Sequence, residues 1–231
     1  MAARVRPFAV LALSFAACTT ASASPPDPPP GSALARDLYA ELVAIPTTAR
    51  TGTTAAAEAL ARRFRAAGFA AEDVVLAGPS PAKQNLFVRL RGSGDAAAIG
   101  FLAHLDVVEA LPEAWSVAPY ALTEDGGWFY GRGTVDMKNG VAALAASLIR
   151  LKRDGFVPRG DVVAAFTADE ENGGPENGVF WMLRERRDLF DVAYAINLDG
   201  AGVLREGGAP VRMGIAVAEK TYATYALTVT S

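Results

Sequence analysis

The chain has 231 residues and a net charge of −3, with 51% apolar and 20% charged residues. This composition is typical of a globular protein and excludes an intrinsically disordered chain. The acidic balance argues against a nucleic-acid partner, because such partners usually require a basic surface. Cys18 is the single cysteine, so the chain cannot form an internal disulfide.

Residues 1–23 have the features of a signal peptide. Arg4 and Arg6 give a positive start, and residues 8–17 form an apolar core that is too short to span a membrane. Ala-Ser-Ala at 21–23 matches a cleavage site. We therefore expect export to the periplasm or to the outside of the cell.

Two alternatives concern this leader. Phe-Ala-Ala-Cys at 15–18 resembles a bacterial lipoprotein box, in which Cys18 would carry a lipid anchor and hold the protein at a membrane. The leader could also stay uncleaved as an anchor. Residues 24–32 contain five prolines, so we expect an extended linker before the folded part.

Apolar periodicity predicts four helices. The first covers residues 33–44, and the second is capped by Thr53 or Thr54. The longest covers residues 138–154, and a fourth is expected to run from Pro175 to Arg187.

Predicted strands alternate with these helices. Residues 96–103, 162–168 and 192–198 are apolar and are expected to form central strands of a covered sheet. Residues 86–90 alternate and are expected at an edge or half exposed, and residues 222–230 alternate as one more strand. The pattern predicts an α/β fold with a mostly parallel sheet covered by helices on both faces.

Polar side chains follow each of the three apolar strands. The single histidine, His104, and Asp106 follow the first, Glu170 and Glu171 follow the second, and Asp199 follows the third. In an open α/β sheet, ligands bind beyond the carboxyl ends of the strands. We therefore expect these side chains to meet at one edge of the sheet.

These residue types suit a metal-dependent hydrolase. Imidazole and carboxylate groups are zinc ligands, and a carboxylate such as Asp136, which precedes the longest helix, can bridge two ions. The His-x-Asp spacing puts Asp106 on the same side of an extended segment as His104, where it can orient the ring. Of Glu170 and Glu171, one can bind metal while the other takes a proton from water.

Each residue also has a plainer interpretation. A single histidine after a buried strand can be an ordinary core residue, and Asp136 can simply favour a helix N-terminus. Asp199 before Gly200 can form a turn. The joint placement of the polar groups favours the metal site, whereas we expect Asp169 to have a local structural role.

Four segments together resemble one enzyme family. They are Ala-His-Leu-Asp-Val-Val at 103–108, Tyr-Gly-Arg-Gly-Thr-Val-Asp-Met-Lys at 130–138, Thr-Ala-Asp-Glu-Glu at 167–171 and Asn-Leu-Asp-Gly at 197–200. Over residues 34–231 the chain resembles the N-terminal portion of a zinc exopeptidase and deacylase family. That family includes glutamate carboxypeptidase, acetylornithine deacetylase, succinyl-diaminopimelate desuccinylase and aminoacylase, and the implied fold is a co-catalytic zinc peptidase domain.

The resemblance implies two zinc ions and the residues that hold them. His104 and Asp199 would bind one ion, Glu171 would bind the other, and Asp136 would bridge both. Co²⁺ or Mn²⁺ could replace Zn²⁺, because nitrogen and oxygen ligands suit several of these ions.

The resemblance assigns the chemistry to two further residues. Glu170 would be the general base that activates water and passes the proton to the leaving amine, and Asp106 would orient His104. The peptide bond between Asp136 and Met137 is expected to be cis, as is often found in the family. The substrate would be a small peptide or an N-acyl amino acid cleaved at an amide bond.

The resemblance also implies parts that the chain does not contain. The family has another zinc-binding histidine toward the C-terminus, and no histidine follows His104 here. We expect residues 33–218 to be a partial catalytic domain and residues 219–231 to begin a truncated lid or dimerisation domain, which could form a homodimer in a full-length protein. We therefore expect little activity from the chain by itself.

Two other functions remain open. An aminopeptidase of the related co-catalytic zinc clan would share the His-x-Asp and paired-glutamate pattern. The sequence Gly-Arg-Gly-Thr-Val-Asp at 131–136 nevertheless favours the first family. A non-catalytic, inactive fragment would account for the missing histidine, but the complete set of polar groups after the strands argues against it.

Overall fold

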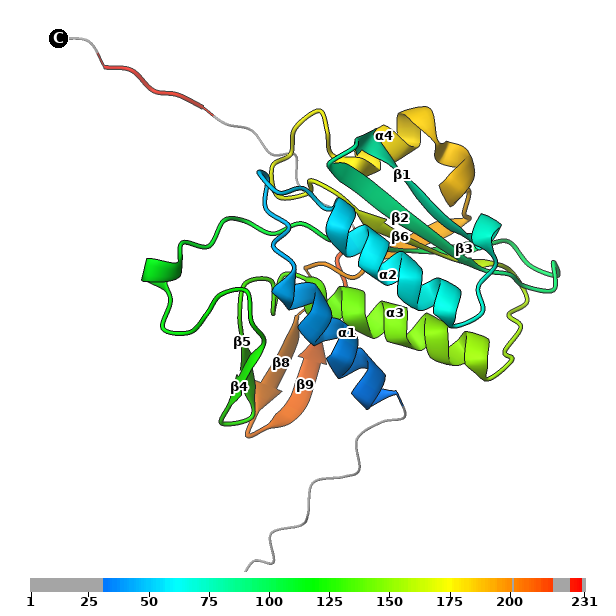
Figure 1. Ribbon diagram of the computed structural model, residues 1–231, viewed down its shortest axis with the longest axis horizontal. Helices are drawn as coiled ribbons and strands as arrows, with labels where there is room; N and C mark the ends of the chain where they lie inside the picture. The colour runs from blue at the N-terminus through cyan, green and yellow to red at the C-terminus, as the bar shows by residue number, and fades with distance from the viewer. Residues whose placement is uncertain (1–30, 201, 218–224, 230–231) are drawn as a thin grey trace, which may run out of the picture. The chain divides into compact units, whose positions relative to one another are not determined.

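The computed structural model describes residues 31–200, 202–217 and 225–229 (Figure 1). The expected signal peptide, Cys18 and most of the expected linker lie outside these residues. Within the described part, no helix is long and apolar enough to cross a membrane. The elements are α1 (Ser32–Ala44), α2 (Thr54–Ala66), η1 (Ala71–Asp73), β1 (Val74–Ser80), β2 (Lys83–Leu90), β3 (Ile99–His104), η2 (Pro112–Ala114), β4 (Thr123–Asp125), β5 (Trp128–Tyr130), α3 (Lys138–Arg153), β6 (Val162–Thr167), α4 (Gly178–Glu185), η3 (Arg187–Phe190), β7 (Tyr194–Asn197), β8 (Val203–Glu206) and β9 (Ala209–Met213).

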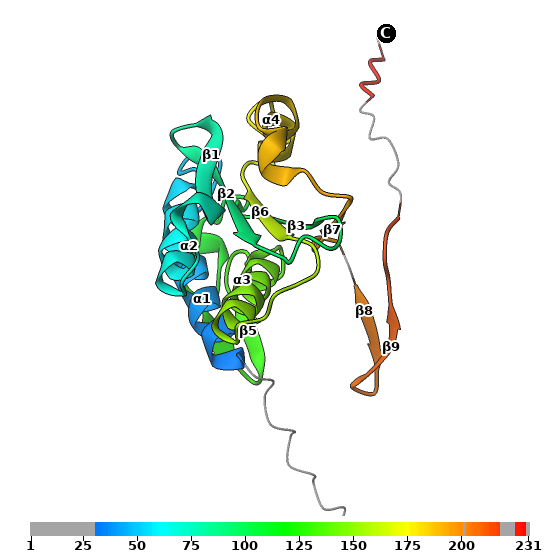
Figure 2. The same cartoon turned by 90° about the vertical axis from the view of Figure 1, so that its right-hand side faces the viewer.

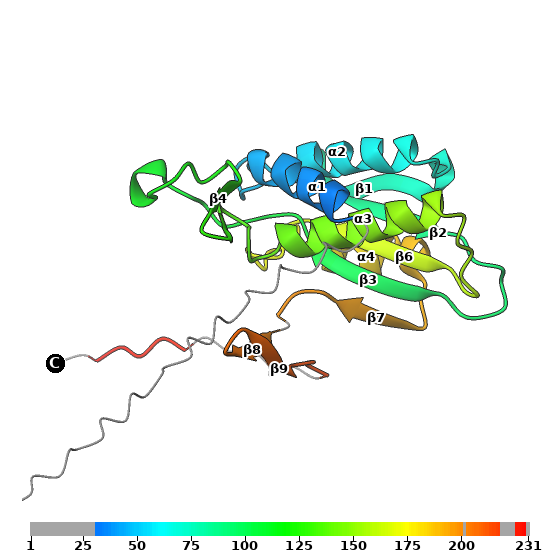
Figure 3. The same ribbon diagram turned by 90° about the horizontal axis from the view of Figure 1, so that it is seen from below.

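The main sheet has five strands in the order β1-β2-β6-β3-β7. β3 pairs in parallel with both β6 and β7, and these three strands lie side by side in Figure 3. β1 and β2 run antiparallel to their neighbours. The register places His104 opposite Thr167, so the carboxyl ends of β3 and β6 meet at one edge of the sheet. The predicted α/β fold with a helix-covered sheet is therefore confirmed, with the parallel part carrying the candidate site.

Helices α1, α2 and α3 lie on one side of the sheet and α4 on the other (Figure 2). Val141 of α3 and Phe64 of α2 belong to the same buried cluster as Phe166 of β6. On the opposite face Met182 of α4 packs in a cluster with Phe87 of β2. Each large apolar side chain buried in this way contributes about 1.5–3 kcal/mol, so both layers hold the sheet firmly.

The prediction that residues 86–90 form an edge or half-exposed strand is wrong. β2 lies inside the sheet between β1 and β6. Leu86 and Val88 are buried against the helices on one face, and Phe87 is buried on the other. The only polar residue of this stretch is Arg89, and its side chain pairs with Asp161; the side chain of Asn85, just before it, is also hydrogen-bonded within the protein.

Three other element predictions need correction. Residues 192–198 were expected to form a central strand, but β7 is an edge strand within the described part of the chain. Helix α4 begins at Gly178 rather than Pro175, because Asn177 caps it by accepting hydrogen bonds from two backbone N–H groups of the first turn. Thr53 precedes α2 but does not cap it, since its hydroxyl donates to the carbonyl of Gln84 instead.

The short β segments expected after Gly200 form the hairpin of β8 and β9. The strand expected over residues 222–230 falls partly outside the described residues, and residues 225–229 form no strand.

Candidate metal centre

His104 is the last residue of β3, and only 3% of it is exposed. Its ring nitrogen Nδ1 lies 3.0 Å from the carbonyl oxygen of Asp106. Because a carbonyl oxygen only accepts hydrogen bonds, Nδ1 must carry a proton and donate it. Nε2 is then the nitrogen directed at the other polar groups, which is the arrangement of a histidine that binds metal.

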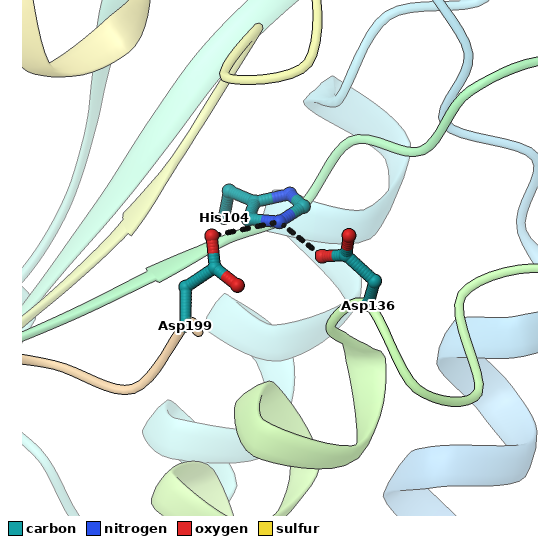
Figure 4. A group of neighbouring side chains, drawn as sticks. All are labelled: His104, Asp136 and Asp199. Atoms are coloured by element: carbon teal, nitrogen blue, oxygen red, sulfur yellow. Dashed lines mark hydrogen bonds and ion pairs between the residues drawn. The ribbon is translucent and has the colours of Figure 1, made fainter. Parts of the chain in front are cut away.

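Two carboxylates from different elements flank Nε2 of His104 (Figure 4). Oδ1 of Asp136 lies 2.8 Å from it, and Oδ2 of Asp199 lies 3.8 Å from it. One ligand atom from each residue lies within 4.8 Å of the other two. An imidazole nitrogen and two carboxylate oxygens in this space fit a divalent ion such as Zn²⁺.

Asp136 reaches this position from the turn that precedes α3. The peptide bond between Asp136 and Met137 is cis, as the family resemblance implied. Met137 is buried, and its sulfur accepts a hydrogen bond from the backbone N–H of His104 at 3.3 Å. The Asp136 side chain is 57% exposed, so it faces the open side of the site while its neighbour anchors the turn.

Asp106 is almost completely buried and joins two parts of the site. Its carboxylate lies 3.6 Å from Nδ1 of His104, and it accepts hydrogen bonds from the backbone N–H groups of Glu170 at 3.1 Å and Glu171 at 3.0 Å. The sequence suggested the contact with His104 but not the contacts with the glutamates. Burial acts to raise the pKa of Asp106, but the interaction with His104 and the hydrogen bonds from the backbone of Glu171 and Glu170 outweigh it and lower the pKa.

The Glu170 and Glu171 side chains are not part of the compact group that His104 forms with the two aspartates. They lie close enough to interact with it electrostatically. Desolvation, with the charges of Asp199 and other nearby carboxylates, raises the pKa of Glu170, and desolvation together with Asp136 raises that of Glu171. A carboxylate whose pKa is raised toward neutrality accepts a proton more readily.

His104 lies in a strongly negative environment. Burial by itself lowers the pKa of the ring, but the carboxylates of Asp106 and Asp136 outweigh it and raise the pKa to about 9. Without metal the ring is therefore protonated at neutral pH. A metal ion at Nε2 would take the place of that proton, so the same carboxylates that stabilise the imidazolium would stabilise the cation.

Sequence analysis did not identify Lys138 as part of the support of the site. This residue begins α3 two positions after Asp136, and only 1% of it is exposed. Its amine donates to the carbonyl oxygens of Leu42 at 2.8 Å and Ile45 at 2.7 Å, at the end of α1. Burial lowers its pKa to about 7. Its partners are backbone groups, so no sequence pattern could have revealed them.

Comparison with protein families gives a match to the model described as Peptidase family M20/M25/M40, over residues 100–230. The match includes the segments that carry His104, Asp136 and Asp199, together with both glutamates. A succinyl-diaminopimelate desuccinylase from Dinoroseobacter shibae is 41% identical over 125 residues. That alignment covers 54% of this chain and 31% of the relative, so the chain matches about a third of the relative's length.

Two solved structures have a similar fold. The M20 family metallo-carboxypeptidase Sso-CP2 from Sulfolobus solfataricus aligns with a TM-score of 0.60 and 19% identity, over 73% of this chain and 38% of that one. The Bacillus subtilis YXEP protein, described as a dinuclear metal-binding peptidase of the M20 family, aligns with a TM-score of 0.50 and 16% identity, over 71% and 41%.

Proposed function

The chain belongs to peptidase family M20/M25/M40, and from this premise we propose that it carries part of the catalytic centre of a metal-dependent hydrolase. The reaction is the attack of water on an amide carbonyl. The observation that carries the proposal is the convergence of His104, Asp136 and Asp199 from three separate elements onto one small volume. Three such ligands leave room for water and substrate at an ion.

The ligand assignment is the one that the family resemblance implies, and the grouping of His104, Asp136 and Asp199 supports part of it. His104 and Asp199 would hold one ion, Glu171 would hold a second ion, and Asp136 would be shared between them. The exposed Asp136 carboxylate, with one oxygen directed at His104, supports a bridging role. Zn²⁺ suits these ligands, and so do Co²⁺ and Mn²⁺. When bound, the ions would polarise the amide carbonyl and lower the pKa of the attacking water.

Glu170 is the proposed general base. It accepts the proton from the attacking water and passes it to the nitrogen of the leaving amine. Its raised pKa supports this role, because a base that must also return the proton works best when its pKa is near the working pH. Asp106 contacts the Glu170 backbone and the His104 ring at the same time. It therefore fixes the position of the proposed base relative to the proposed metal ligand.

The proposed substrate is an N-acyl amino acid or a small peptide, and the desuccinylase relatives favour the N-acyl class. Export of the protein, whether soluble or anchored through Cys18, is proposed from the leader sequence alone. Because the matches cover about a third of the relatives' length, we propose that turnover requires further family segments, including another metal ligand.

Metal content tests the proposal directly. The chain is dialysed against Zn²⁺ and then against metal-free buffer, and the bound metal is measured by mass spectrometry. We expect about one or two ions per chain, their loss in Asp136→Ala and their retention in Asp125→Ala, an exposed aspartate in β4. A folded chain that retains no metal would contradict the proposal.

A further inference from the structure

Lys83, the first residue of β2, forms ion pairs with two carboxylates in the segment after β6. The Nζ atom of Lys83 lies 2.9 Å from Oδ1 of Asp169 and 3.0 Å from Oε2 of Glu176. The Lys83 side chain is 14% exposed and that of Asp169 is 5% exposed, so water screens this pair only weakly. Lys83 and Asp169 are 86 positions apart in the sequence, so their contact depends on the fold.

Asp169 has an unusual backbone conformation. Its φ of 57° lies in the left-handed region, and within the described residues no other non-glycine residue has a positive φ. Its Oδ1 atom also accepts a hydrogen bond from the Asn172 side chain at 2.8 Å, and its carbonyl accepts one from the Asn177 side chain at 3.3 Å. The surrounding side chains therefore hold this conformation in place.

The position of Asp169 connects this arrangement to the candidate metal centre. Glu170 and Glu171 follow it directly, and their backbone N–H groups are held by Asp106. A left-handed residue immediately before the pair decides the direction in which the chain leaves β6. The contact between Lys83 and Asp169 fixes one end of the turn, and Asp106 fixes the other.

We propose that Lys83 is a positioning residue whose ion pair with Asp169 orients the turn that presents Glu170 and Glu171 to the metal centre. The relevance of this turn to metal binding and catalysis rests on the function proposed above. Lys83 itself touches neither substrate nor metal. It acts through Asp169, in the manner of the outer partners that orient metal ligands elsewhere.

A purely structural role for Lys83 gives a different expectation. β2 has a second ion pair, in which Nη1 of Arg89 lies 2.7 Å from Oδ2 of Asp161. This pair is also partly buried, but it lies toward the opposite end of the same strand. If Lys83 only stabilises the sheet, loss of either ion pair should have similar effects on the Glu170 and Glu171 turn.

The test compares Lys83→Met, Lys83→Arg and Arg89→Met by amide hydrogen exchange and by Co²⁺ affinity. In Lys83→Met we expect the amides of Glu170 and Glu171 to exchange about tenfold faster, while the amides of α3 keep their protection. We expect Co²⁺ binding to weaken by about 10–100-fold, with a changed visible absorption spectrum. Lys83→Arg should retain the slow amide exchange and the Co²⁺ affinity of the unmodified chain, and Arg89→Met should change neither.

Unchanged exchange at Glu170 and Glu171 in Lys83→Met, or an equal effect of Arg89→Met, would overturn the inference. If Lys83→Met does not fold, Asp169→Asn replaces it, because asparagine tolerates a positive φ, keeps one acceptor oxygen and removes the negative charge that pairs with Lys83. The exchange measurement needs no metal. Failure of the unmodified chain to bind Co²⁺ would therefore count against the proposed function, while the exchange rates would still decide the role of Lys83.

Discussion

Oδ2 of Asp106 accepts a hydrogen bond at 3.0 Å from the backbone N–H of Glu171, which lies 65 residues later in the chain. The other oxygen of the same carboxylate accepts from the N–H of Glu170 and lies 3.6 Å from the His104 ring. A single buried carboxylate thus fixes the histidine at the end of β3 and the glutamate pair after β6. Movement of either part would disturb the other.

Replacement of Asp106 by asparagine should damage both parts of the site. The amide group of asparagine has only one acceptor oxygen, so its NH₂ group would face a backbone N–H of the glutamate pair. We expect the free energy of unfolding to fall by about 1–3 kcal/mol and metal affinity to fall by about 10–100-fold. Urea denaturation and competition with a metal chelator would measure the two effects.

Asp154→Asn is the matched control, because Asp154 is an exposed aspartate at the end of α3. We expect its effect on stability to stay within about 0.5 kcal/mol, with no change in metal affinity. Equal behaviour of the Asp106 and Asp154 variants would show that the buried carboxylate does not link the two parts.

Replacement of Lys138 by methionine should destabilise the fold. Methionine keeps most of the buried volume but cannot donate to the carbonyls of Leu42 and Ile45. Leaving these acceptors without a donor costs about 1–3 kcal/mol, partly offset because no ammonium group has to be desolvated. Urea denaturation at pH 7 would measure the loss, with the exposed Arg153→Met at the far end of α3 as control. Stability equal to or above that of the unmodified chain would mean that desolvation of the amine outweighs its hydrogen bonds.

A single methyl group at Gly178, the first residue of α4, should disrupt the packing of the helix start against β2 and the end of β6. A Cβ atom there would lie 2.1 Å from Oδ1 of Asn85 and 2.7 Å from the backbone nitrogen of Ala168, which are themselves hydrogen-bonded. We expect Gly178→Ala to lower the free energy of unfolding by about 1–3 kcal/mol. Gly174→Ala in the loop before α4 should be tolerated, because its nearest neighbour would be 4.0 Å away. Similar unfolding curves for both variants would contradict this expectation.

Much of the fold could be predicted from apolar patterning. The helices at residues 33–44 and 138–154 and the strands that carry the site were recognisable because their buried faces have a regular period. The inner position of β2 was not recognisable, because the polar Arg89 gives residues 86–90 the pattern of a half-exposed strand, and Asn85 before them is polar as well. Their partners Gly178 and Asp161 are 93 and 72 residues away, and no local pattern contains that information.

The candidate site was likewise only partly predictable from the sequence. The rule that ligands lie beyond the carboxyl ends of parallel strands placed His104 and Asp199 correctly at the same edge of the sheet. It could not show that Asp106 binds the backbone of the glutamate pair, or that Lys83 and Asp169 meet. These contacts depend on tertiary positions and on backbone groups, which every residue carries and which therefore leave no trace in the sequence.

The stability of the metal-free chain should depend on the ionisation of His104. Its pKa is about 9 in the folded protein, against an ordinary value of 6.5, so the folded state holds this proton more tightly than the unfolded state. The resulting stabilisation is complete below about pH 6.5 and is lost as the pH rises through 9. Lys138, with a pKa lowered from 10.5 to about 7, acts in the opposite direction above pH 7.

The difference between the unmodified chain and His104→Gln isolates the histidine, because Lys138 is present in both. We expect this difference in the free energy of unfolding to be largest near pH 6 and to shrink between pH 6.5 and 9, as measured by urea denaturation with a chelator present. With Zn²⁺ instead of the chelator, the stabilisation should persist at high pH, because the metal replaces the proton on Nε2. A difference that grows with pH in the metal-free protein would show that the carboxylates around His104 do not hold a proton there.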